Sequence, residues 1–327
     1  MIAIFRQKSS GNALILLLYG LVLKFHTFLY PVKPVPNPGD NYIYLGILNF
    51  FKPLAEGAPV VFSILAFLIL FAEATLLNRI VNSLRLFPKP NYLTAMAYIL
   101  LSSMMKDWGS FSAPLIVNGC LIWIYYLLQG LHNNNKPKAA IFNVAVLTGI
   151  LPLIYAPAIA YVSLLLLALF VMRAFSITEI LVALLGVITP YYFFFVVLYL
   201  TNQWTIDKIV PSFTFYFPKM PSSLWITGGI TLLMVPFLMG GYFVQGNLNK
   251  MLIQVRKSWS LLLLMLVVSL LVILINPGYN YLPWMVVIVP LAAFHAATYF
   301  YLPSKWGGHL LHWVSFAFVI MLNYRII

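Results

Sequence analysis

Residues 58–78 read APVVFSILAFLILFAEATLLN, with Glu73 as the single charged side chain. A helix needs about 20 mostly apolar residues to cross the hydrocarbon core of a bilayer, so this run predicts a transmembrane helix. Comparable apolar runs follow one another along the chain and predict an all-α, polytopic transmembrane protein. We expect about eleven spans, near residues 12–31, 58–78, 91–105, 112–131, 140–155, 157–173, 178–200, 223–244, 258–275, 281–300 and 309–325.

The composition supports a membrane location. Hydrophobic residues make up 63% of the 327 residues, and the mean hydropathy is +0.96. A soluble core could not bury that much apolar surface. The net charge of +13 would indicate a nucleic-acid partner in a soluble protein. Here the basic residues lie in short loops between apolar runs, so the predicted partner is the lipid bilayer and not nucleic acid.

The loop charges predict the orientation of the chain. Basic residues are retained in the cytoplasm, and alternating the expected spans puts about twice as many of them on one side. This side is therefore predicted to be cytoplasmic, with the N-terminus inside and the C-terminus outside. The inner set is Arg6, Lys8, Arg79, Arg85, Lys89, Lys136, Lys138, Arg173, Lys250, Arg256, Lys257 and Lys305. The outer set is Lys33, Lys52, Lys106, Lys208, Lys219 and Arg325.

Two prolines interrupt the middle of the chain. In GILPLIYAPA, residues 149–158, Pro152 and Pro157 predict a tight hairpin between the spans 140–155 and 157–173. Both spans are short, so this hairpin could stop short of the full bilayer thickness.

Two outer loops are long enough to hold structure. The first runs from Pro31 to Gly57, opens with the proline-rich PVKPVPNPGD, and continues with an amphipathic stretch that predicts an interfacial helix. The second, residues 201–222, is rich in aromatic residues and could lie flat on the membrane.

The first outer loop carries an acid, Asp40, at the head of its expected helix in the stretch Gly39-Asp40-Asn41-Tyr42. This arrangement resembles the GT-C class of membrane glycosyltransferases, which use polyprenyl-phosphate sugars and place an acid at this point. The class often adds a second acid in the next outer loop, where Asp107 stands here. The resemblance implies a GT-C-like helical module over residues 1–200 and a C-terminal helical bundle over 201–327, within a single transmembrane domain 1–327. Asn41 stands where the class usually has a further acid, which also leaves a degenerate, inactive relative open.

The chemistry gives the acids and nearby lysines distinct roles. A carboxylate at the membrane surface, Asp40 or Asp107, could accept the proton of an acceptor hydroxyl. Lys33, Lys52 or Lys106 could hold the donor phosphate by charge-assisted hydrogen bonds. No cofactor is predicted, and a divalent metal would require Asp40 and Asp107 to converge from separate loops. The alternative is that Asp40 is an ordinary turn or N-cap residue.

Three other features could be functional. Glu73 lies within a span, where it could form a proton or ion relay, or could be paired or reach the nearby interface. Lys24 is expected to extend outward from the first span. His295, His309 and His312 could bind haem or a metal across two helices, but no matching carboxylate pair or CxxCH motif accompanies them, which favours ordinary interfacial hydrogen bonding.

Two further functions stay open. A transporter or flippase would use polar groups near the bilayer midplane, for which Glu73, Asn118 and Asn143 are candidates. A non-catalytic subunit of an envelope complex would dock an envelope protein partner on the aromatic loop 201–222. The opening MIAIFRQKSSGN and the stretch TPYYFFF, residues 189–195, also resemble an uncharacterised family of multi-pass membrane proteins of Bacteroidota type, which implies a bacterial inner membrane.

Overall fold

The computed structural model describes residues 1–9, 11–132, 134, 136–205, 215, 223–275 and 281–324, with the backbone alone at 55 and 305. These residues form helices and no strand, so the predicted all-α class is confirmed for the described part of the chain. The first half contains α1 Ile2–Phe5, α2 Asn12–Leu29, α3 Tyr42–Phe50, α4 Lys52–Gly57, α5 Val60–Ser83, α6 Leu93–Leu101, η1 Lys106–Gly109, α7 Ala113–Gln129 and α8 Pro137–Ile154. The second half contains η2 Ala156–Ala160, α9 Tyr161–Met172, α10 Ile177–Leu200, α12 Leu224–Asn247, η3 Leu248–Lys250, α13 Ile253–Leu274, η4 Leu282–Val287, α14 Ile288–Tyr301 and α15 Lys305–Tyr324.

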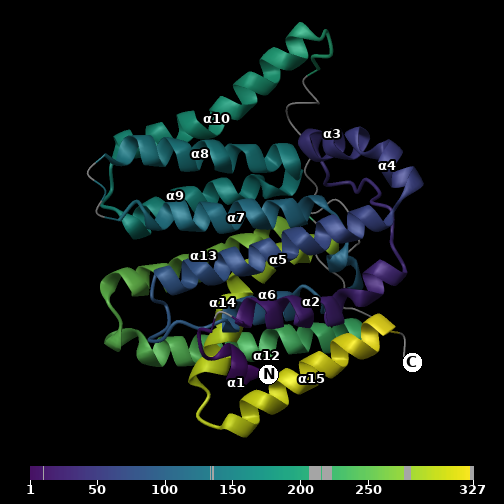
Figure 1. Ribbon diagram of the computed structural model, residues 1–327. Helices are drawn as coiled ribbons and strands as arrows, with labels where there is room; N and C mark the ends of the chain where they lie inside the picture. The colour runs from purple at the N-terminus through teal and green to yellow at the C-terminus, as the bar shows by residue number, and fades with distance from the viewer. Residues whose placement is uncertain are drawn as a thin grey trace.

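The long helices lie roughly side by side in one bundle (Figure 1). Its central helix is α14, which packs against α6, α7, α12 and α13. Buried residues make up 94% of the apolar window over η4 and α14, but only 17% of the corresponding window in α10. Apolar helices that stay this exposed must face lipid in a membrane protein. The bundle therefore has a protein-covered centre and a lipid-facing periphery, to which α10 belongs.

Seven helices among the described residues are long and apolar enough to cross a membrane. The predicted count of about eleven is therefore too high. The span expected at 91–105 is only α6, nine residues long, which is far short of a bilayer thickness. The apolar helices 113–129 and 156–172 are also shorter, and α15 begins with the polar stretch Lys305-Trp-Gly-Gly-His309.

Of the two helices in the proline hairpin, both predicted to be short, only the second is short. Helix α8 begins at Pro137, where a proline at the first turn is tolerated, and continues through Pro152 to Ile154. It is thereby long enough to span. The following helix, α9, is the short one, because the chain first forms the 3-10 segment η2.

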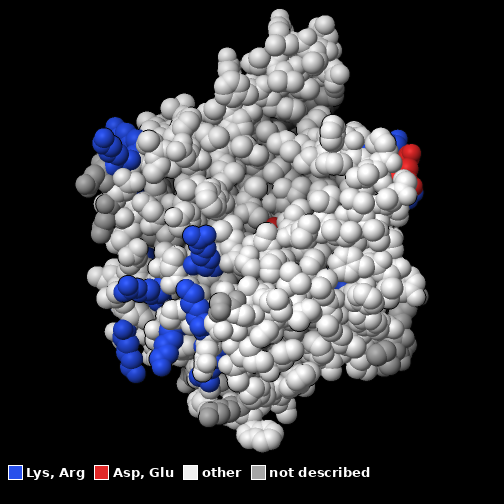
Figure 2. All heavy atoms as spheres, viewed as in Figure 1, with Lys and Arg blue, Asp and Glu red and all other residues white. Residues whose placement is uncertain are grey.

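Basic residues gather at one end of the bundle. On the face shown in Figure 2, Lys and Arg side chains cluster at the end with the α12–α13 turn, and acidic atoms are visible near α4 at the opposite end. Contacts join the loops of the basic end, since Arg6 donates to the Phe300 carbonyl at 2.7 Å and Lys257 donates to the Met172 carbonyl at 3.2 Å. The loops predicted to share the inner side thus meet in space. Of the outer set, Lys208, Lys219 and Arg325 lie outside the described residues, as does most of the loop 201–222.

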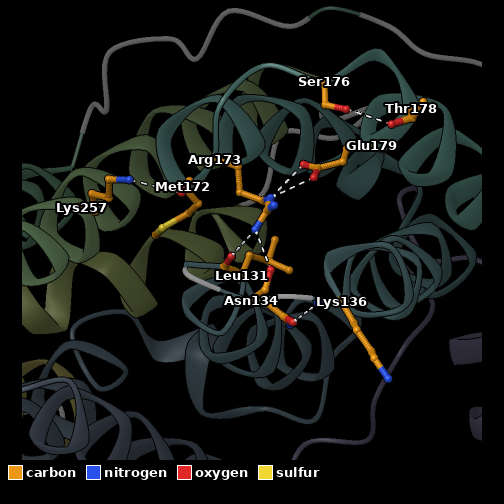
Figure 3. Close-up of polar contacts among 9 residues, drawn as sticks. All are labelled: Leu131, Asn134, Lys136, Met172, Arg173, Ser176, Thr178, Glu179 and Lys257. Atoms are coloured by element: carbon orange, nitrogen blue, oxygen red, sulfur yellow. Dashed lines mark hydrogen bonds and ion pairs between the residues drawn. The ribbon is translucent and has the colours of Figure 1, made fainter.

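Arg173 ties two turns together at this basic end (Figure 3). Its Nε lies 3.0 Å from both carboxylate oxygens of Glu179, the one ion pair among the described residues. Its NH1 donates to the carbonyls of Leu131 at 3.0 Å and Asn134 at 3.3 Å. The α7–α8 and α9–α10 turns are therefore held by a single guanidinium group, whose planar fork suits several acceptors at once.

The first and last long helices run in the same direction. Near their starts, Tyr19 of α2 stacks on His312 of α15, and near their ends Asn323 donates to the Leu23 carbonyl at 3.3 Å. In Figure 1 the N-terminus lies at the lower middle of the view and the last described residues lie at its lower right. Which end faces the cytoplasm stays a prediction.

Candidate functional site

The first outer loop ends in a tight turn that positions Asp40. The Asp40 N–H donates to the Asn37 carbonyl at 2.9 Å, and the Asn37 N–H donates back to Asp40 Oδ2 at 2.8 Å. Asn41, and not Asp40, is the N-cap residue of α3, because its Oδ1 accepts from the Tyr42 N–H at 2.8 Å. Asp40 was expected to be either a turn residue or an N-cap residue if it had an ordinary structural role. The structure shows that it is a turn residue.

This turn is docked on the end of α8. The Asn41 N–H donates to the Ile154 carbonyl at 3.0 Å, and Asn41 Nδ2 donates to the Pro152 carbonyl at 2.8 Å. In return, Gly39 accepts from the Ala156 N–H at 2.9 Å, completing an isolated antiparallel bridge between Asp40 and Tyr155. The last carbonyls of a helix have no partner within it. Here the first loop supplies donors for them.

Tyr155 faces Asp40 across a small cavity. A methyl group on Gly39 would overlap the Tyr155 ring, so only glycine allows this close approach. Asp40 Oδ1 and the Tyr155 hydroxyl are both buried, and neither has a hydrogen-bond partner among the described residues. Both side chains line the cavity with Pro114 and Pro283, and its volume of about 10 Å³ is close to that of a single water site.

The surroundings change the acidity of Asp40. Burial raises the pKa of Asp40 to about 6, and the hydrogen bonds from Asn37 oppose this rise. A carboxylate of this kind is poised to exchange a proton near neutral pH. Asp40 thus combines a raised pKa with a buried oxygen atom, Oδ1, that has no hydrogen-bond partner among the described residues.

Asp107 lines a separate cavity. It lies exposed in η1 and borders a space of about 110 Å³ with Lys106, His26 and Ser110. Lys106 also lines an adjoining space of about 730 Å³ that includes Tyr30 and Tyr324. The structure therefore places Lys106 beside Asp107 but does not bring Asp40 and Asp107 into one cavity. Lys33 and Lys52 are exposed on the first loop and line neither space.

The Asp40 cavity and the Lys106 cavity are neighbours along the chain. Asn37 and Pro114 line the Asp40 cavity. Val32 and Phe111, a few residues away in the sequence, line the cavity that contains Lys106 and Asp107. Helix α3 joins the same two segments, because the buried Tyr44 hydroxyl donates to the Phe111 carbonyl at 3.0 Å. The segments 32–37 and 111–114 thus contribute to the walls of both cavities, and other parts of the chain complete each one: Tyr155, Leu282 and Pro283 the first, and His26, Thr27 and Ser63 the second.

Of the other sequence candidates, Lys24 is placed differently from the expectation, and His295 makes an ordinary hydrogen bond. Lys24 does not extend outward: it is 4% exposed and donates to the Ser102 carbonyl. His295 points to α12, with Nε2 2.8 Å from the Leu233 carbonyl, whereas His312 packs between Tyr19 and Tyr299. No group of three metal-ligating side chains occurs in the described ranges. The histidines do not form a shared site there.

Sequence reasoning missed Tyr155 and the docking role of Asn41. Both depend on contact between the first loop and the end of α8, which are far apart in the sequence. The only local signal was the pair of prolines around LIYAP, which marked a turn but not its partner. In comparisons with known proteins, no family model, no curated protein and no solved structure matches this chain.

Proposed function

We propose that this integral membrane protein transfers a sugar from a polyprenyl-phosphate donor, with Asp40 as the general base. The observation that carries the proposal is the partly buried Asp40 carboxylate, whose Oδ1 has no partner among the described residues. The arrangement of the first loop supports it: short helices α3 and α4 follow the first long helix, as in the GT-C class that the sequence resembles. Asp40 lies at the start of α3.

The reaction assigns a separate role to each cavity. Asp40 Oδ1 accepts the proton of an acceptor hydroxyl while the acceptor oxygen bonds to the anomeric carbon of the sugar. The bond from that carbon to the phosphate oxygen breaks, and polyprenyl phosphate leaves with the bonding electrons. In this proposal Lys106, which lines a cavity together with Asp107, is the cation that stabilises the leaving phosphate. Asp107 has no required part in this scheme, and neither does a divalent metal.

A transfer assay tests the proposal directly. The full-length protein in lipid nanodiscs is supplied with a radiolabelled polyprenyl-phosphate hexose and a membrane extract as the source of acceptor, and the release of polyprenyl phosphate is measured. Asp40→Asn should lower the rate by about 10²- to 10⁴-fold, which is the usual contribution of a general base. Asp107→Asn is the control and should retain the rate.

The pH dependence adds a second criterion. Because only the ionised carboxylate accepts a proton, the rate should fall as the pH drops below the Asp40 pKa of about 6. This acid limb should be absent from the residual activity of Asp40→Asn. Equal losses in Asp40→Asn and Asp107→Asn would favour a two-carboxylate site. If no polyprenyl phosphate is released from any polyprenyl-phosphate hexose, the result would instead favour a non-catalytic subunit of an envelope complex.

A further inference from the structure

Glu73 is a buried acid that the proposed reaction does not use. It lies in α5, a helix long and apolar enough to span the membrane, and its residue is 4% exposed. It neither pairs with Arg79 nor reaches an interface, contrary to one of the two expectations, since the described residues contain a single ion pair, Arg173–Glu179. Arg79 is exposed.

Two neighbouring helices surround the carboxyl group. The Tyr98 hydroxyl of α6 donates to Glu73 Oε2 at 2.7 Å. On the other side, a methyl group at Gly119 of α7 would lie 3.0 Å from Glu73 Oε1, so glycine is what lets α7 approach. The Asn118 side chain lies beside the Tyr98 hydroxyl and donates to the Met285 carbonyl at 3.0 Å.

Two oxygen atoms in this group lack a donor. Glu73 Oε1 and Asn118 Oδ1 are both buried and have no hydrogen-bond partner among the described residues. Both side chains contact the same Tyr98 hydroxyl. An ionised carboxylate in this position would have the Tyr98 hydroxyl and the Gly119 backbone as its polar neighbours and no cation to balance its charge, which is unfavourable in a buried core. One proton on the carboxyl group removes the charge, which is the larger part of this cost.

We propose that Glu73, Tyr98 and Asn118 form a buried proton-binding site, in which Glu73 holds the proton as a neutral carboxylic acid. The packing selects a proton over a metal ion. Asn118 and Tyr98 are fully buried, and even a methyl group at Gly119 would lie 3.0 Å from Oε1, so the several oxygen ligands of a metal ion have no room to assemble.

The surroundings do not supply a compensating cation. The titratable groups that face Glu73 from the packed helices are Tyr98 on α6 and Cys120 on α7, and both are neutral or anionic. The buried Lys24 on α2 bonds to the Ser102 carbonyl instead. Loss of the proton would therefore leave an unpaired charge among α5, α6 and α7, and the site links the packing of these helices to its proton occupancy.

Carbodiimide labelling tests the protonation state. A hydrophobic carbodiimide reacts with a protonated carboxyl group: the acid O–H adds across one C=N bond, with the proton passing to nitrogen. We expect mass spectrometry of the labelled full-length protein at neutral pH to find the adduct on Glu73. Glu179 is the internal control and should stay unlabelled, because its carboxylate is occupied by the ion pair with Arg173. Glu73→Gln should lose the adduct.

Two variants and one infrared measurement make the test decisive when the reagent cannot enter. The infrared carbonyl band of a protonated carboxylic acid should be present in the wild type and absent in Glu73→Gln. This variant should melt at the temperature of the wild type, because glutamine is the neutral isostere. Tyr98→Phe removes the hydroxyl that donates to Oε2, so the carbonyl band should move to higher frequency, as expected for a carboxylic acid that loses a hydrogen bond. Identical carbonyl spectra in the wild type and Glu73→Gln would overturn the proposal, as would protection from the carbodiimide by sodium ions alone.

Discussion

Asn41 fills two hydrogen-bonding roles that a carboxylate could not fill together. Its Oδ1 accepts from the Tyr42 N–H, and its Nδ2 donates to the Pro152 carbonyl. A carboxylate only accepts, so an acid at this position would face a carbonyl oxygen without a hydrogen between them. The residue that stands where the GT-C class usually has a further acid is therefore explained by docking on α8.

We expect Asn41→Asp to destabilise the protein by about 1–3 kcal/mol, the usual cost of leaving buried polar groups unsatisfied. Thermal unfolding in detergent measures this, with the reactivity of the single Cys120 thiol as the signal. Asn49→Asp is the matched control, because it makes the same change at an exposed position of the same helix and should be nearly neutral. Equal melting temperatures for the two variants would contradict the assigned role of Asn41.

For individual residues, the sequence predicted the position of Asp40 but not its neighbours in the site. The place of Asp40 at the head of an outer-loop helix could be read from the short stretch around it. Its partner Tyr155 could not, because nothing local in LIYAP identifies the loop that docks there. Lys24 and Glu73 show the same limit, since a charge pattern cannot tell a buried polar contact from a side chain that reaches the interface.

Among the elements, α12 and α14 form a polar seam inside the apolar bundle. Pro236 interrupts the hydrogen bonding of α12. On the facing helix, His295 contacts the Leu233 carbonyl at 2.8 Å and Thr298 donates to the Pro236 carbonyl at 2.5 Å. Small residues let the backbones of membrane helices come close, and Gly240 does so against α14. The seam thus satisfies the backbone carbonyls of Leu233 and Pro236.

Gly240→Ala should separate these helices, because the added methyl would overlap the Phe294 carbonyl and lie 2.9 Å from Thr298 Oγ1. We expect a loss of about 1–3 kcal/mol in the free energy of unfolding. The neighbouring Gly241→Ala meets no atom within 4 Å, and should be neutral or stabilising by up to about 1 kcal/mol from helix propensity. Melting temperatures that fall equally for both variants would show that the seam is not closely packed.

For the whole molecule, clustering of the basic residues predicts which end is cytoplasmic. In a Cys120→Ala background, Lys89→Cys should react with a membrane-impermeant maleimide only after the cells are lysed, and Lys52→Cys should react in intact spheroplasts. Both lysines are exposed, at opposite ends of the bundle. The background without an added cysteine is the control. The reverse pattern would place the N-terminus outside, and labelling of both from one side would refute a membrane between the two ends.

The sequence predicted the class of fold better than the number of spans. Apolar run length identifies helices, but it does not show where a helix ends within its run. The run around α6 is long enough in the sequence, yet only Leu93–Leu101 is helical there. Conversely, α8 is longer than expected because a helix can start at one proline and continue through another.

The buried position of α14 has a consequence for biosynthesis. Chains are made from the N-terminus, so every helix from α2 to α13 leaves the ribosome before η4 and α14. In the finished bundle, 94% of the residues in the apolar window of η4 and α14 are buried. The faces of α6 and α12 that contact α14 must therefore be held by lipid or by the insertion machinery until the last part of the chain arrives. A nascent chain that stops before residue 282 lacks the helix that closes the assembly, which makes it a substrate for membrane quality-control proteases.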